Sequence, residues 1–205
     1  MTAETFIDGL ARATDATGKL IASVGEDQWS NSTPCPDFNT RTLINHLVFG
    51  NRLFTGILSG DPPLPPSDMP RLRPADQLGA DPFAAHRDAG AGLVAAFSQP
   101  GVLERIFRAP IGAVPGLVML HVRITEELVH GWDLAQATGQ PARLPGDLAE
   151  VELGFSRGQF DGGLPRTGRF GEAQPVAAAA PAIDRLAAFL GRSGRDAEPA
   201  ATPPR

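Results

Sequence analysis

The stretch EELVHGWDLA, residues 126–135, decides both the fold expected for this chain and the place of its chemistry. It lies inside a predicted helix at about residues 115–137, which ends before 138–139 because glycine supplies a C-terminal stop. Residues four apart on a helix share a face, with Cβ atoms roughly 5–6 Å apart. Glu126 and His130 can therefore close on one metal ion, since Zn–N and Zn–O bonds are about 2.0–2.2 Å long. A third ligand must come from elsewhere in the chain.

Apolar residues recur at helical spacing in five further segments of the sequence. Three of them predict long helices, at about residues 3–24, 40–58 and 82–98. Two shorter helices are expected at about 146–159 and 181–190. Asn39 or Thr40 is the expected cap of the second long helix, and proline in the first turn favours the start of the third.

The connections between these helices are rich in proline and glycine. A turn-rich loop covers residues 30–39, a long crossover covers 60–82, and a Gly- and Pro-rich loop covers 161–176. The segment Val102–Ile111 is ambiguous and allows a short extended piece, but no alternating pattern predicts a substantial sheet. Four long amphipathic helices with a long crossover predict an all-α four-helix bundle with extra short helices. Bundle cores commonly hold metals between facing helices.

Length and composition narrow the class of protein. The chain has 205 residues, which suits one domain, expected at 1–192, followed by a disordered tail at 193–205. Its formal net charge of −5, without a Lys/Arg cluster, argues against a nucleic-acid partner. No signal peptide and no run of about 18 apolar residues is evident, and the single cysteine, Cys35, allows no intrachain disulfide. We therefore expect a cytoplasmic protein without a membrane partner; a homodimer is one assembly that the sequence leaves open.

The chain contains four histidines, of which three are candidates to join His130. His46 lies on or beside the inward face of the second helix, because Leu43 and other apolar residues flank it at helical spacing. His86, near the start of the third helix, is expected to be exposed. His121 precedes His130 by about two and a half turns, so the two point to different faces. His46 is thus the best third ligand.

The choice of carboxylate is less clear from spacing. Glu127 is three residues from His130 and is also a permitted helix neighbour, so Glu126 is favoured and Glu127 stays open. Two nitrogens and one oxygen with room for solvent form the open arrangement of catalytic zinc sites. The same ligand types suit Ni, Fe or Co.

Other polar and aromatic residues lie near this motif in the sequence. Arg123 can bind an anionic substrate or pair with a glutamate one turn away, and Trp132 is expected in the core or in a pocket wall. Asp133 can orient His130 by accepting a hydrogen bond from its other ring nitrogen, or can be exposed or cap a helix. Cys35 stands between two prolines without a histidine nearby in sequence, which favours a structural role.

Two motifs carry a family resemblance. The stretch TPCPDF at 33–38 followed by LINHL at 43–47, and the stretch EELVHGWDLA at 126–135, resemble the two signatures of the mycothiol-dependent maleylpyruvate isomerase N-terminal-domain family. The segment 170–192 is similar to the ending of an actinobacterial subgroup of that family. The resemblance implies a DinB-like bundle of the metal-binding superfamily, with His46, Glu126 and His130 as ligands.

The resemblance also implies thiol chemistry. A low-molecular-weight thiol such as mycothiol would bind the metal as thiolate, the nucleophilic form, and attack an electrophilic substrate. The isomerase carries an additional C-terminal domain, which we expect this chain to lack. We therefore expect a metal-dependent thiol transferase or isomerase, with a non-catalytic protein that binds metal or a small thiol as the alternative.

Overall fold

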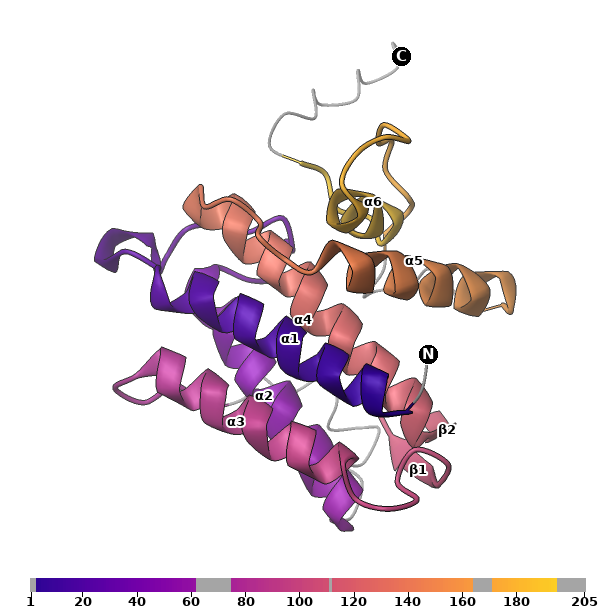
Figure 1. Cartoon of the computed structure of the whole chain (residues 1–205). Coiled ribbons are helices and arrows are strands. Elements are labelled where there is room, and N and C mark those ends of the chain that lie inside the picture. The colour runs from indigo at the N-terminus through magenta and orange to yellow at the C-terminus, as the bar shows by residue number, and fades with distance from the viewer. Residues whose placement is uncertain (1–2, 62–74, 111, 164–170, 195–205) are drawn as a thin grey trace.

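The structure is a computed structural model that describes residues 3–61, 75–110, 112–163 and 171–194 (Figure 1). Four long helices form a bundle, and short elements flank it. The long helices are α1 (Ala3–Ala22), α2 (Thr40–Ser59), α3 (Pro82–Phe97) and α4 (Gly116–Thr138). The short elements are η1 (Glu26–Gln28), β1 (Ile106–Ala109), β2 (Gly112–Pro115), α5 (Gly146–Asp161) and α6 (Ala182–Phe189). The all-α class and the bundle are confirmed.

Each long helix packs against two neighbours around the bundle. α1 contacts α3 and α4, and α2 contacts the same two helices from the opposite side. α5 and α6 contact each other and α4, so they form an extra layer on the α4 side (Figure 1). α4 therefore has partners on nearly every side, and its buried residues lie all around its circumference rather than in one stripe.

The helix ends follow the capping chemistry of the sequence. Asn39 caps α2, because its side chain accepts a hydrogen bond from the Thr42 backbone N–H while Thr42 Oγ1 accepts one from the Asn39 backbone. α4 ends at Gly139, whose φ of 72° lies in the left-handed region that glycine adopts at low cost. Both helix ends are as expected.

The ambiguous segment Val102–Ile111 contains the first strand of an antiparallel hairpin, whose second strand follows it directly. β1 pairs with β2 from Ile106↔Pro115 to Ala109↔Gly112. This is the only sheet in the described part of the chain, so the expected lack of a substantial sheet holds. No helix among the described residues is long and apolar enough to cross a membrane. Of the tail expected at 193–205, residues 195–205 lie outside the described part of the chain, as do 62–74 of the crossover and 164–170 of the loop.

The loop before α2 is fastened to the C-terminal end of α4. Gln28 Nε2 donates to the Thr138 carbonyl, and Asn31 Nδ2 donates to the Ala137 carbonyl, each at 3.0 Å. Thr33 Oγ1 donates within the loop and braces its turn. These bonds bring residues 33–38 against the helix that carries His130.

Two glycines of α3 allow a test of the bundle packing. Gly90 is buried against α1, where an added Cβ would overlap the Thr14 methyl group, whereas a Cβ at Gly92 would meet nothing within 4 Å. We expect Gly90→Ala to lower the free energy of unfolding by about 1–3 kcal/mol through overpacking. Gly92→Ala should raise it by up to about 1 kcal/mol through helix propensity.

Urea unfolding of both variants measures the two changes. Thr14→Ser removes the overlapping methyl group, so it should recover much of the Gly90→Ala loss in the double variant. Equal effects of the two glycine substitutions would contradict this packing of α1 on α3.

Candidate metal centre

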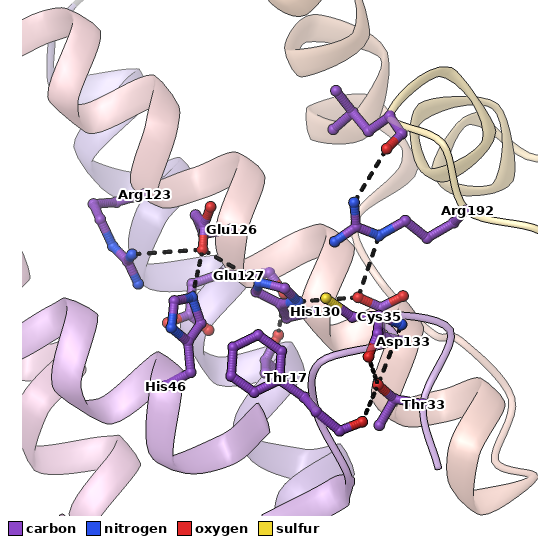
Figure 2. Close-up of polar contacts among 12 residues, drawn as sticks. Thr17, Thr33, Cys35, His46, Arg123, Glu126, Glu127, His130, Asp133 and Arg192 are labelled. Carbon is purple, nitrogen blue, oxygen red and sulfur yellow. Dashed lines mark hydrogen bonds and ion pairs between the residues drawn. The ribbon is translucent and has the colours of Figure 1, made fainter. Parts of the chain in front are cut away.

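The three expected ligands converge between α2 and α4. Glu126 Oε2 lies 3.1 Å from His46 Nε2 and 3.3 Å from His130 Nε2 (Figure 2). One ligand atom of each of the three residues lies within 4.8 Å of the others. For metal bonds of about 2.0–2.1 Å, two corners of a tetrahedron are about 3.3–3.4 Å apart. The spacing of the Glu126 oxygen from the two imidazole nitrogens therefore suits ligands of one metal ion.

The site is buried at one end and accessible at the other. The His130 side chain is 6% exposed, whereas the His46 side chain is 33% and the Glu126 side chain 23% exposed. The Phe38 ring covers part of this opening, with its centroid 5.0 Å from that of His46 and 6.3 Å from that of His130. A small molecule therefore has an approach beside His46 and Glu126.

The charges of the site stabilise one another. Burial by itself raises the pKa of Glu126, but hydrogen bonds with His130 and His46 outweigh it and hold that pKa well below its ordinary value. Burial lowers the pKa of His130, yet hydrogen bonds with Asp133 and Glu126 raise it to about 9. Burial dominates at His46 and lowers its pKa. These shifts favour an ionised Glu126 beside a protonated His130.

Asp133 contacts the other side of the His130 ring. His130 Nδ1 lies 3.0 Å from Asp133 Oδ2, and the Asp133 side chain is fully buried. A proton on Nδ1 is donated to this carboxylate, which directs Nε2 toward Glu126 and fixes the plane of the ring. The contact between His130 and Asp133 is the one expected from their three-residue spacing on the helix.

Glu127 points away from this cluster into the bundle core. Its carboxylate lies 3.0 Å from His86 Nε2 and accepts a hydrogen bond of 2.8 Å from Asn51 Nδ2. Both Glu127 and His86 are 0% exposed. The expectation that His86 is exposed is wrong, because α3 turns this residue inward to pair with a buried carboxylate. The sequence did contain an indication of this burial. His86 begins a row of residues at helical spacing, continued by Gly90, Leu93 and Phe97, that forms the buried face of α3.

Arg123 links the buried network to the cluster. Its guanidinium donates to Asn51 Oδ1 at 2.9 Å and lies 3.9 Å from Glu126 Oε2. Gly50 leaves room for it, since an added Cβ would lie 2.7 Å from Arg123 Nη1. The residue is 2% exposed, so its charge lies buried between Asn51 and the cluster.

Trp132 faces a different neighbour from His130. Two residues along a helix correspond to a rotation of about 200°, so the side chains point in nearly opposite directions. The indole Nε1 donates to Asp184 Oδ1 of α6 at 2.7 Å, and the residue is 3% exposed. Trp132 is therefore a core residue between α4 and α6 and does not line the metal cluster.

Cys35 and Arg192 are the site neighbours that sequence reasoning missed. The Cys35 Sγ lies within 4.8 Å of ligand atoms of both His130 and Asp133, although no histidine is near it in sequence. Burial raises the pKa of its thiol to about 11, so the thiol is protonated at neutral pH. Arg192 approaches Asp133 from the C-terminal segment. Both contacts span long stretches of chain and leave no local sequence signal.

The fold and cluster define a helical bundle of the DinB-like type with a candidate His–Glu–His metal centre. The chain belongs to the mycothiol maleylpyruvate isomerase N-terminal domain family, whose family model matches residues 10–135. Two uncharacterised proteins from two strains of Mycobacterium tuberculosis are each 40% identical to it over 189 residues, which span 90% of this chain and 96% of each relative.

Solved structures agree with this fold. A crystal structure of the mycothiol-dependent maleylpyruvate isomerase matches with a TM-score of 0.56, and one of its histidine-to-alanine mutant with 0.59. Each match has 13% sequence identity and covers 75% of this chain and 70% of the other. At that identity the likeness concerns the fold.

The raised pKa of His130 predicts a pH dependence of stability in the metal-free protein. Because the folded pKa of about 9 exceeds the ordinary 6.5, the stabilisation is complete below pH 6.5 and is lost as the pH rises through 9. The pKa shift corresponds to on the order of 3 kcal/mol in the free energy of unfolding. Glu126 stays ionised over this pH range, so it does not contribute to the pH dependence of the unfolding free energy.

Urea unfolding in the presence of a chelator, at pH 6 and pH 9.5, tests this. The difference in unfolding free energy between the wild type and His130→Gln should shrink toward the higher pH. A difference that stays constant would show that the protonated imidazole contributes nothing.

Proposed function

We propose that this protein is a metal-dependent enzyme that uses a small thiol, mycothiol being the first candidate, to attack an electrophilic substrate in an isomerase or transferase reaction. The observation that carries the proposal is the convergence of His46, Glu126 and His130 within the segment that matches the family model. Membership of a mycothiol-dependent family supports the identity of the thiol.

The residues fit a divalent metal in number and type. His46 Nε2, Glu126 Oε2 and His130 Nε2 would hold it, and three protein ligands leave a position for a further molecule, as in catalytic zinc sites. Zinc suits this set best, and Ni, Fe or Co are alternatives. The metal would supply a Lewis acid that favours the deprotonated, nucleophilic form of a thiol.

The chain's own residues prepare this position. Asp133 accepts the proton of His130 Nδ1 in a hydrogen bond, so Nε2 is the nitrogen that ligates once its own proton has left. The Phe38 ring packs beside both histidines and adds an apolar surface to the site. Arg123 adds a positive charge 3.9 Å from Glu126, which would attract an anionic group of the substrate.

Metal content gives the first test. We expect about one equivalent of divalent metal in the purified wild type and its loss in His46→Ala, His130→Ala and Glu126→Gln. The matched control is His121→Gln, because His121 is also a buried α4 histidine with a carboxylate partner, Glu152, but lies outside the cluster. Elemental analysis measures the metal. Equal content in the ligand variants and the wild type would remove the proposed site.

Thiol binding gives the second test. With cobalt in the site, mycothiol should produce a near-ultraviolet thiolate-to-cobalt charge-transfer band, because a thiol ligates as thiolate. The Glu126→Gln variant and an S-methylated thiol are the controls. No band with millimolar mycothiol would refute thiol binding.

Conjugation of mycothiol to maleylpyruvate and to other electrophiles then tests catalysis. Turnover by the wild type that is lost in His46→Ala supports the enzyme. A charge-transfer band without turnover of any electrophile would contradict the enzyme proposal and support a non-catalytic thiol-binding protein instead.

A further inference from the structure

We propose that Arg192 is a positioning residue of the metal centre: it holds Asp133 and, through Asp133, sets the orientation of His130. Arg192 follows α6, and its Nε lies 3.5 Å from Asp133 Oδ2, the oxygen that also contacts His130 Nδ1 (Figure 2). The inference rests on the proposed function of His130 as a metal ligand.

The burial of Asp133 explains why it needs a cation. Its side chain is 0% exposed and the Arg192 side chain is 10% exposed, so water screens the pair little. Asp133 Oδ1 has no hydrogen-bond partner among the described residues. Leaving one oxygen of a buried carboxylate unsatisfied is costly unless nearby positive charge offsets it. Arg192 places such a charge against Oδ2, the same oxygen that contacts His130 Nδ1.

The end of α6 is built to bring Arg192 to this place. Gly191, with φ of 91°, ends the helix in the left-handed conformation. The Gly191 N–H donates to the Ala188 carbonyl and the Arg192 N–H to the Ala187 carbonyl, the two bonds of a Schellman motif. The Arg192 guanidinium also donates to the Leu190 carbonyl at 3.1 Å. The chain therefore turns back over α6 with its arginine directed to α4.

A second contact fastens α6 beside the same residue. Trp132, which precedes Asp133 in the chain, donates its indole N–H to Asp184 of α6. His130 and Asp133 fall inside the matched segment 10–135, whereas Arg192 lies well beyond it. The C-terminal helix thus completes the surroundings of a ligand that the family domain provides.

Metal affinity of the full-length protein tests this inference. Competition with a chromophoric chelator should show zinc binding about 10–100-fold weaker in Arg192→Gln, the usual effect of removing a group that supports a ligand. Arg192→Lys keeps the charge and should recover most of the affinity. The matched control is Arg185→Gln, because Arg185 lies on α6, the helix that Arg192 follows, and pairs with Glu150 at the surface. Its zinc affinity should equal that of the wild type.

The outcomes separate positioning from simple docking of α6. Trp132→Phe removes the indole hydrogen bond and leaves the Arg192 charge. It should therefore lower the melting temperature while the zinc affinity stays close to that of the wild type. Wild-type affinity in Arg192→Gln would overturn the inference, and so would an Arg192→Lys variant as weak as Arg192→Gln. A wild type that binds no zinc would instead refute the proposed function.

Discussion

The burial of α4 on nearly all sides is the constraint on which the rest of the structure depends. This helix carries charged and polar side chains that have no access to bulk water, and each needs a partner from another element. Glu127 takes His86 of α3 and Asn51 of α2, while His121 takes Glu152 of α5. Trp132 takes Asp184 of α6, and Asp133 takes Arg192 beyond it. The polar residues of one helix therefore specify how its neighbours dock, in addition to the apolar packing of the core.

Glu126 and Glu127 are adjacent in sequence, yet their carboxylates have different roles because one helical step turns them in different directions. A rotation of about 100° per residue sends Glu127 into the core and Glu126 to the accessible end of the cluster. Glu127 is saturated by partners that are themselves buried, so it serves stability. Among the described residues, the Glu126 oxygen contacts His46 and His130 closely and Arg123 at 3.9 Å, so it faces the two imidazoles that can ligate the same metal ion.

Local patterns predicted what depends on local geometry. The four long helices, the Asn39 cap, the stop at Gly139 and the Glu126–His130 pair all follow from periodicity, capping chemistry and helix spacing. The expected exposure of His86 failed because the short-range pattern around it looked polar, while its partner lies in another helix. Cys35 and Arg192 reach the site only because the loop 33–38 and the end of α6 fold onto α4. Such contacts depend on tertiary packing, which a single sequence does not display.

The donor atoms of the cluster lie close together, and the acid–base state of His130 affects how strongly the proposed metal binds. Glu126 Oε2 contacts both imidazoles, so the donor atoms need little movement to surround an ion. The pKa of about 9 means that a proton must leave His130 before its Nε2 can ligate. Asp133 acts on both sides of this balance, because it raises that pKa and also makes the neutral imidazole a better donor. Metal affinity should therefore increase with pH up to the range in which His130 loses its proton, even though the metal-free fold loses stability there.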